Sequence, residues 1–478
     1  MINRRRFVHT LTAAGIGAVT ADCFAASSEP RRRAVNRGAD VLRSADGRLN
    51  VTLHAAETNV TVGGRRARLF AYDGRVPAPR IEVRPGDEIS LRLENQLSES
   101  TNLHFHGLHI PPSGSSDNIF LHITPGQTFD YRFTIPSSHP AGLFWIHPHM
   151  HGSVARQVSR GLAAPLVIRG EIDQIPEVAA AAEHVLVLQD FALDAAGIPL
   201  EPSMPELTHG REGALITLNG QSAPLIGVEG GGLLRLRLVN ASSSRFYRLA
   251  LEQHPLHIIG VDGGALSAVR SVDEILFVPG QRLDILVHAT RGTGRYRLLS
   301  LPYDRGSAEM MGGMGGGSGA SETLTLATVE YRGQSSRTWI LPQRLVTAPA
   351  LSAANAPPRT IQLGQGMGMG RGMSFLINGR TFDENRIDAA PRLGSIEEWE
   401  YVNPTGMDHP MHLHTNPFQI VQPDGSLEGA WRDIALVKAG ARTRIRVSFE
   451  DFTGKTVQHC HILDHEDLGM MATVEMRA

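Results

Sequence analysis

Apolar and polar residues alternate along many short stretches of this chain, and long runs with helical spacing are scarce. Ile89, Leu91 and Leu93 occupy every second position of one stretch, and three leucines repeat the pattern at 234–238. An apolar residue at every second position indicates a strand with one buried face. The sequence also holds 50 Gly and 28 Pro, which favours many turns between short strands. We therefore predict an all-β protein.

One spacing recurs three times along the chain. In each copy a Gly turn precedes an alternating strand, and an Asn follows nine residues after the Gly. The three pairs are Gly86 and Asn95, Gly231 and Asn240, and Gly394 and Asn403. Recurrence at intervals of roughly 150 residues indicates repeated domains, for which Greek-key sandwiches or barrels are the natural architecture. We predict domains at 45–172, 180–335 and 355–478, with a Met/Gly-rich loop at 305–320 in the second.

The N-terminal residues 1–28 are typical of an export signal. Three arginines at 4–6 precede a mildly apolar stretch over 7–21, and small residues suited to cleavage follow. Arg4, Arg5 and Phe7 match the twin-arginine pattern, although an ordinary signal with a chance arginine pair is the alternative. A lipoprotein anchor on Cys23 is a poor fit because Asp22 precedes it. We predict an exported, periplasmic-type protein without a stable membrane anchor.

Charge and cysteine content narrow the function further. The 46 basic and 48 acidic residues nearly cancel, so nucleic acid and anionic membranes are poor partner hypotheses. If the signal is removed, Cys460 is the single remaining cysteine of the two in the chain. An exported protein cannot use a lone thiol for an internal disulfide. Cys460 therefore needs another role.

Four motifs contain eleven of the 21 histidines, ten of them candidate ligands and the eleventh His151. They are HFHG (His104, His106), WIHPHMHG (His147, His149), HPMHLH (His409, His412, His414) and HCHILDH (His459, His461, His465). On a strand, residues two apart point to the same side, so each His-x-His pair aims two imidazoles at one place. Eight imidazoles could thus meet in one cluster. His104 and His412 each lie nine residues after the repeated Asn, where the middle copy has Leu249, so the middle domain is predicted to be a spacer.

Cys460 must face the opposite side of its strand from the two histidines beside it. His409, an odd number of residues before His412, can do likewise. With His465 and Met470 these residues supply two imidazoles, a thiolate and a thioether, the ligand set of a blue-copper electron-transfer site. Zinc explains this set poorly, because it has no use for a thioether and no redox cycle.

In their order and spacing, the four motifs resemble those of the three-domain multicopper oxidases, the laccase-like family. The resemblance covers the whole predicted mature chain and includes the stretch YDGRVPAPRIEVRPGD at 72–87. It implies three consecutive cupredoxin-like Greek-key domains and four copper ions, one of type 1, one of type 2 and two of type 3. Chance or purely structural histidines explain one such motif easily, but not all four.

The resemblance also implies a role for each ligand. The type 1 site would comprise His409, Cys460, His465 and axial Met470; the type 2 site His104 and His412; and the two type 3 sites His106, His147 and His461, and His149, His414 and His459. His151 and Met471 fall outside the pattern and are expected to pack or to support the ligands. The peptide links from Cys460 to the flanking histidines would offer electrons a short route between sites.

Reducing O2 to water takes four electrons and four protons, so buried acids near the cluster are candidates to relay protons. Asp117, eleven residues after His106, and Glu466, beside His465, are the two candidates. Ordinary salt-bridged or surface acids are the equal alternative for each.

Two Met/Gly-rich stretches, 308–319 and 363–374, bear on the reductant. Their density of Gly predicts mobile loops, and soft thioethers suit Cu(I); a flexible linker with chance methionines is the alternative. The candidate Cu(I)-binding residues are Met310, Met311, Met314, Met367, Met369 and Met373. Bacterial copper-tolerance oxidases similarly carry Met-rich inserts in this part of the chain.

We therefore predict a monomeric multicopper oxidase that couples oxidation of Cu(I), or of phenols and aromatic amines, to O2 reduction, with a role in copper tolerance. Within the family, the alternative is a laccase with mainly organic substrates. From other classes, a copper-storage protein has no need of the His-Cys-His strand, and division or structural proteins on this scaffold usually lose copper ligands. Copper-dependent nitrite reductases use related domains, but the four motifs point to O2.

Overall fold

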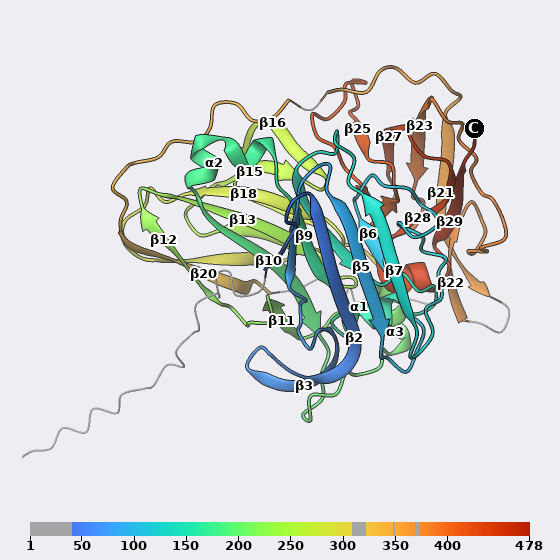
Figure 1. Ribbon diagram of the computed structural model, residues 1–478, viewed down its shortest axis with the longest axis horizontal. Coiled ribbons are helices and arrows are strands. Elements are labelled where there is room, and N and C mark those ends of the chain that lie inside the picture. The colour runs from blue at the N-terminus through green and yellow to red at the C-terminus, as the bar shows by residue number, and fades with distance from the viewer. Residues whose placement is uncertain (1–40, 308–321, 348, 369–371) are drawn as a thin grey trace, which may run out of the picture. The chain divides into compact units, whose positions relative to one another are not determined.

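β-Strands dominate the protein (Figure 1). The computed structural model describes residues 41–307, 322–347, 349–368 and 372–478. Across these ranges, 29 strands form six sheets. The predicted export signal over 1–28 and the Met/Gly stretch 308–319 lie outside the described residues. The six sheets pair into three consecutive sandwiches, which confirms the predicted all-β class.

Domain 1 contains one five-stranded and one four-stranded sheet. The first runs in the order β1 (Val41–Arg43), β4 (Arg80–Val83), β9 (Ala164–Ile168), β8 (Gly142–His147) and β6 (His104–His106). The second runs β3 (Arg65–Tyr72), β2 (Arg48–Val62), β5 (Glu88–Asn95) and β7 (Thr128–Thr134). Buried residues of both sheets, including Leu91, Phe105 and Leu166, share one core. Strand β1 precedes position 45, where we predicted the domain to begin.

Domain 2 contains a six-stranded and a five-stranded sheet around a second core. The first runs β11 (Leu215–Leu218), β10 (Ala182–Phe191), β13 (Leu233–Asn240), β18 (Arg282–His288), β15 (Leu256–Val261) and β16 (Gly264–Val272). The second runs β12 (Leu225–Gly230), β20 (Leu324–Gln334), β19 (Arg295–Leu301), β14 (Tyr247–Leu251) and β17 (Glu274–Phe277).

Domain 3 contains a five-stranded and a four-stranded sheet around a third core. The first runs β22 (Gly372–Ile377), β21 (Arg359–Gly368), β23 (Ser395–Val402), β27 (Arg442–Phe449) and β25 (Phe418–Val421). The second runs β26 (Ile434–Val437), β24 (His409–Leu413), β28 (Gly454–Cys460) and β29 (Met471–Met476). In all three domains, strands distant in sequence lie side by side, as Greek-key crossovers require. The exact domain limits stay a prediction.

The described helices are short, with at most six residues each. They are α1 (Val154–Ser159), the 3-10 turn η1 (Glu171–Gln174), α2 (Pro176–Ala180), α3 (Met204–His209) and α4 (Leu463–Asp467). None of these described helices has the length and apolar character that a membrane crossing requires. Helix α4 carries His465 of the last histidine motif, and α3 of domain 2 lies against α4.

The repeated Asn occupies the same structural position in each domain. The Asn95 side-chain amide donates to the carbonyls of Glu99 and Ile123 at 2.9 and 2.8 Å, and its Oδ1 accepts the N–H of Leu97. Asn240 and Asn403 make the equivalent bonds within their own domains. The Gly nine residues earlier has a positive φ in all three copies, between +79° and +89°. The repeated spacing in the sequence thus corresponds to the same structural unit in each domain: a Gly turn, a strand, and a loop closed by the Asn side chain.

The middle copy differs from the outer two. Leu249 and Leu251 of β14, at the positions of the outer histidines, are 0% and 3% exposed and belong to the core of domain 2. The strand β13 is buried on both faces, not on one as predicted, because Arg235 and Arg237 on its polar face are also buried. Acidic residues including Asp173 and Asp284 pair with these guanidinium groups, which offsets the cost of burying them.

The second Met/Gly-rich stretch is not the loop that we predicted. Strands β21 and β22 pair as an antiparallel hairpin with Met367 opposite Met373, and only 369–371 at the tip lie outside the described residues. Met373 is 7% exposed and packs in the core of domain 3. Gly density misled the prediction because backbone pairing with a neighbouring strand stabilises extended glycines whatever their own preference.

Candidate metal centre

Eight histidines from domains 1 and 3 meet in one buried cluster, hereafter the imidazole cluster. Antiparallel pairing sets His104 of β6 opposite His147 of β8, and His412 of β24 opposite His459 of β28. The second histidine of each His-x-His pair lies on the same side, as strand alternation predicts. All eight side chains are at most 1% exposed: His104, His106, His147, His149, His412, His414, His459 and His461.

Ring nitrogens from the two domains face each other at short range. The Nε2 atoms of His104 and His412 lie 3.3 Å apart, and that of His459 lies 3.2 Å from His149 and 3.0 Å from His414. The nitrogens of His149, His414 and His459 lie close enough together to hold one ion. This trio is the set that the family resemblance gives to one type 3 copper.

The other predicted sets are also close together. His104 and His412, the predicted type 2 pair, form a group with His414 whose nitrogens lie within 4.8 Å of one another. Ring nitrogens of His106, His147 and His104 also lie within 4.8 Å of one another. The ring of His461 lies 5.1 Å from that of His106 and 5.6 Å from that of His147, measured between centroids.

Burial keeps imidazoles of the cluster neutral. It lowers the pKa of His104, His106, His147, His149, His412, His414 and His461, and repulsion from neighbouring rings adds to the effect; the pKa of His147 falls to about 3 and that of His104 far below its usual range. A neutral imidazole carries one N–H and one lone pair, and the lone pair is what binds a metal. The cluster therefore offers lone pairs, not positive charge, at ordinary pH.

Unsatisfied nitrogens show that the cluster fits metal ions. Buried polar atoms almost always have a hydrogen-bond partner. Several ring nitrogens of the cluster have none among the described residues: Nδ1 of His106, His149 and His414, Nε2 of His147, and both nitrogens of His461. Because His106 Nε2 lies 3.1 Å from Asp433 Oδ1, its free Nδ1 is the atom left to bind a metal. Copper, a borderline ion with high affinity for imidazole, suits such a donor set.

Asp117, predicted from the sequence, lies against the cluster. Its carboxylate accepts the His104 Nδ1–H at 3.0 Å and the N–H of Phe105 at 2.9 Å. This bond fixes the His104 tautomer and leaves Nε2 as the metal-binding atom. With Asp117 1% exposed, burial raises the pKa of its carboxyl to about 8.

Glu466, the second predicted acid, also lies at the cluster. Its Oε2 is 2.9 Å from His459 Nδ1 and its Oε1 is 3.4 Å from His149 Nε2. The Glu466 side chain is fully buried. Both predicted acids therefore lie directly beside histidines of the cluster.

Asp433, just before β26, is an acid of the site that the sequence reasoning missed. Its Oδ1 lies 3.1 Å from His106 Nε2, and its carbonyl oxygen accepts the His412 Nδ1–H at 2.8 Å. One residue thus orients a histidine of domain 1 and a histidine of domain 3. No spacing relative to the histidine motifs marks it, because the pairing of β24 with β26 brings it there.

A second potential metal site lies on the other face of β28. Cys460 Sγ is 3.5 Å from His409 Nδ1 and 3.9 Å from His465 Nδ1, and all three side chains are fully buried. The outer nitrogens are occupied: His409 Nε2 bonds to Thr405 Oγ1 at 3.0 Å, and His465 Nε2 to the Thr208 carbonyl at 2.9 Å. Each Nδ1 lone pair is thereby left for a metal. Burial raises the pKa of the Cys460 thiol, so a bound cation is needed to stabilise the thiolate.

The remaining sulfur and histidine candidates are placed as follows. Met470 is fully buried in the core of domain 3, and its carbonyl accepts the N–H of Cys460 at 3.0 Å. Met471 packs with Ile119 and Val457, and His151 packs against Phe382 with 4.6 Å between ring centroids. Met310, Met311, Met314 and Met369 lie outside the described residues.

Domain 2 covers the Cys460 site. The carbonyl that binds His465 belongs to Thr208 of α3, and the Arg211 side chain beyond it pairs with Asp464 at 2.7 Å. On its other side, the ring of Phe375 stacks on His465 with 3.7 Å between centroids. The imidazole edge of His465 is therefore shielded from solvent on both sides.

The fold and these two sites define a copper protein built from cupredoxin-like domains. Family models described as multicopper oxidase match residues 54–172, 183–315 and 352–478, which together span most of the chain. The chain belongs to the multicopper oxidase family and is an oxidoreductase.

Individual proteins agree with this assignment. The multicopper oxidase Mco of Staphylococcus aureus is 26% identical over 427 residues, covering 86% of this chain and 85% of that protein. The cell division protein FtsP of Salmonella typhimurium is 30% identical over 400 residues, covering 81% of each. A solved structure entitled a multicopper oxidase from Campylobacter jejuni, a metallo-oxidase, is 29% identical with a TM-score of 0.76, covering 94% of both chains.

Proposed function

We propose that this oxidase couples the one-electron oxidation of Cu(I) to the four-electron reduction of O2 to water, with a role in copper tolerance. Phenols and aromatic amines are secondary substrates. One observation carries the proposal: Cys460 on one face of β28 meets His409 and His465, while its neighbours His459 and His461 reach the imidazole cluster from the other face. A single strand thus joins an electron-entry site to an oxygen site by peptide bonds.

We propose four copper ions, arranged as the family resemblance implies. His409, Cys460 and His465 with Met470 would hold type 1 copper, His104 and His412 would hold type 2 copper, and the remaining six cluster histidines would hold the type 3 pair. When bound, the copper ions store single electrons and deliver them to O2. The protein contributes neutral lone pairs in fixed tautomers and a cluster from which bulk water is excluded.

The buried acids serve protons and orientation. Asp117 beside His104 Nδ1 and Glu466 beside His459 Nδ1 are the carboxyl groups placed to pass protons toward the cluster. Asp117 also orients the ring of His104. Its two roles are separable, because an amide at position 117 keeps an oxygen acceptor for the ring N–H but cannot carry a proton.

The cover over His465 favours a small reductant. A bulky aromatic cannot contact the ring of His465, because α3 and Phe375 enclose it. Arg305 lies three residues before the stretch 308–319. Its guanidinium donates to the His209 carbonyl, at the end of α3, at 2.6 Å. The chain thus enters its first Met/Gly-rich stretch from beside the cover. Thioethers that capture Cu(I) are soft ligands of the kind this stretch supplies.

Met373 is left out of the proposed Cu(I) set, because it packs in the core of domain 3. The set comprises Met310, Met311, Met314, Met367 and Met369. The metallo-oxidase of Campylobacter jejuni, similar over most of its length, supports a metal ion as reductant. A laccase with mainly organic substrates is the alternative within the family.

The likeness to FtsP raises a division role on the same scaffold. The twelve predicted ligand positions are all present and buried in this chain, with eleven of them brought together in the two sites described above. A protein that needed no copper would have no use for so many unpartnered buried nitrogens. A copper-storage role, likewise, leaves the shared strand β28 unexplained.

Oxygen consumption by the copper-loaded protein tests the proposal. The chain is assayed with Cu(I) and with a phenol, before and after deletion of 308–319. A matched variant replaces Met310, Met311 and Met314 with Leu, which removes the sulfur but keeps length and apolar character. We expect both variants to lose Cu(I) turnover and to keep phenol turnover. Unchanged Cu(I) turnover in both contradicts the role of this stretch, and no oxygen uptake with either reductant contradicts the oxidase itself.

We further propose that the protein is exported through its twin-arginine-like segment at 1–28, acts in the periplasm or outside the cell, and works as a monomer. Detection of the copper-loaded, shortened chain in the exported fraction, and its loss when Arg4 and Arg5 become Lys, tests the route.

A further inference from the structure

Domain 2 supplies no imidazole to the cluster, yet it lies directly against it. The turn before β18 packs Gly280 on the ring of His461: a Cβ at this position would lie 2.7 Å from the ring. The φ of Gly280 is +81°, which also favours glycine. Two residues later, β18 begins with Arg282, whose side chain is 1% exposed. The spacer domain therefore approaches the cluster through Gly280 and Arg282.

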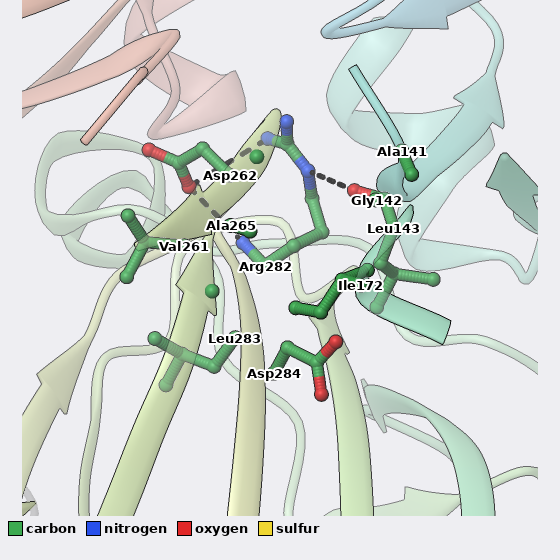
Figure 2. Close-up of a pocket in the computed structure, with 12 residues that line it drawn as sticks. Ala141, Gly142, Leu143, Ile172, Val261, Asp262, Ala265, Arg282, Leu283 and Asp284 are labelled. Carbon is green, nitrogen blue, oxygen red and sulfur yellow. Dashed lines mark hydrogen bonds and ion pairs between the residues drawn. The ribbon is translucent and has the colours of Figure 1, made fainter. Parts of the chain in front are cut away.

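Arg282 binds groups from all three domains. Its Nε–H donates to the Leu143 carbonyl of domain 1 at 3.2 Å (Figure 2). Its Nη1–H donates to the Gly280 carbonyl at 2.9 Å. Both Nη atoms donate to the carboxylate of Asp433 in domain 3, Nη1 at 2.6 Å. Figure 2 shows the carboxylate of Asp262 on the side of Arg282 away from Leu143, where its Oδ1 accepts the Arg282 backbone N–H at 3.2 Å.

Asp433 passes this restraint to the histidines. Its Oδ1 lies between Arg282 Nη1 and His106 Nε2, at 2.6 and 3.1 Å. Its carbonyl holds the Nδ1–H of His412. If the carboxylate rotated, His106 would lose the acceptor that selects its Nδ1 as the metal-binding atom. A two-pronged guanidinium prevents that rotation, because it bonds both oxygens in one plane.

We propose that Arg282 is a positioning residue for the type 2 and type 3 copper ions of the imidazole cluster. It acts through Asp433 on His106 and His412. This inference rests on the proposed function, since it needs copper in the imidazole cluster. It gives the ligand-free domain 2 a specific part in the oxygen site. The alignment of the metal-binding nitrogens of domains 1 and 3 then depends on Arg282, which belongs to domain 2.

The competing explanation is that the pair merely stabilises the junction. Breaking a buried ion pair is destabilising wherever it lies, because it leaves one charge unpaired. Arg235 offers the matched comparison: it is 2% exposed, lies in the same sheet, and its side chain bonds Asp284 at 2.9 and 2.6 Å, but it contacts no histidine of the cluster. A lysine at either position keeps the positive charge but loses the planar, two-pronged hydrogen bonding of the guanidinium.

The experiment compares copper-loaded full-length Arg282→Lys and Arg235→Lys with the wild type. For each, the type 2 electron paramagnetic resonance signal and the total copper per chain are measured relative to the blue type 1 absorbance during titration with a chelator. We expect Arg282→Lys to lose copper from the imidazole cluster, read from the total copper per chain and the type 2 signal, at about 10- to 100-fold lower chelator, as is usual when a residue that orients ligands is changed. The blue absorbance stays unchanged, and Arg235→Lys behaves as the wild type.

Equal retention of copper in the imidazole cluster by both variants, or equal loss, overturns the proposal. If Arg282→Lys does not accumulate as a blue protein, Asp433→Asn is the second variant, because it keeps an oxygen for His106 but presents an amide to Arg282. It too must lose copper from the imidazole cluster while the blue absorbance stays. Failure of both to fold shows a folding role instead and also refutes the proposal. A wild type without a type 2 signal contradicts the proposed function, not this inference.

Discussion

Replacing Asp117 with Ala tests how the chain holds one ligand of the predicted type 2 site. Asp117 accepts two buried donors, the N–H of Phe105 at 2.9 Å and the Nδ1–H of His104 at 3.0 Å. Alanine leaves both without an acceptor, and each lost bond costs about 1–3 kcal/mol. Loss of the hydrogen bond from Phe105 lowers the free energy of unfolding. Loss of the hydrogen bond from His104 weakens copper binding, because the ring no longer has a fixed tautomer and orientation.

The expected loss of copper affinity follows from the lost His104 hydrogen bond alone. About 1–3 kcal/mol corresponds to a decrease of roughly 5- to 150-fold. The assay is chelator titration of the copper-loaded protein, with the type 2 resonance signal read against the blue absorbance. Asp117→Asn keeps an oxygen acceptor and is expected to retain most of the copper. Asp130→Asn, which changes an exposed ion pair with Arg92, is the surface control.

Wild-type copper affinity in the Ala variant would refute the orienting role. If the Asn variant keeps its copper but reduces O2 much more slowly, the carboxyl also serves protons, because an amide accepts the ring N–H but cannot exchange a proton. If the Asn variant keeps both copper and turnover, the relay through Asp117 is wrong.

Three further outcomes are expected. Cys460→Ser should abolish the blue colour and all turnover, and a variant that stays blue contradicts the ligand assignment. Asn240→Ala removes three buried hydrogen bonds, so urea unfolding should show a loss of about 3 kcal/mol; a loss near zero would show that the repeated Asn does not close its loop. Burial lowers the pKa of His139 to about 4, so the unfolded chain binds its proton first as pH falls. The stability gained from this residue is present above about pH 6.5 and is lost toward pH 4. Wild type should therefore lose about 2 kcal/mol more than His139→Gln between pH 7 and pH 5; equal pH dependence of the two unfolding free energies would contradict the shift.

Much of the site was predictable because strand geometry is local. Alternation alone places His459 and His461 on one face and Cys460 on the other, whatever the rest of the fold does. The nine-residue spacing to Asn95 and Asn403 marks equivalent strands in two domains, so the histidines that follow had to occupy equivalent places. These inferences needed neither the order of strands in a sheet nor the packing of one domain on another.

The residues that were missed act at long range. Asp433 reaches the cluster because β26 pairs with β24, and Thr208 reaches His465 because α3 of domain 2 lies against α4 of domain 3. Nothing in the sequence near the histidines marks either residue. Arg282 had a detectable signal: it follows the PGQ turn of domain 2, and PGQ also precedes Thr128 in domain 1. A buried arginine in place of threonine at a repeated position suggests a special contact.

The second domain explains why three repeats are kept when only two carry ligands. It covers the edge of His465 with Thr208 and contacts the imidazole cluster with Gly280 and Arg282. Both contacts fall on histidines of domain 3 or on the acid that orients them. Two domains alone would leave the ring edge of His465 and the back of His461 open to water, where a bound metal would exchange more easily and the electrostatics would be screened. Domain 2 thus has core leucines at the positions of the outer histidines, while residues in its turns help to close both sites.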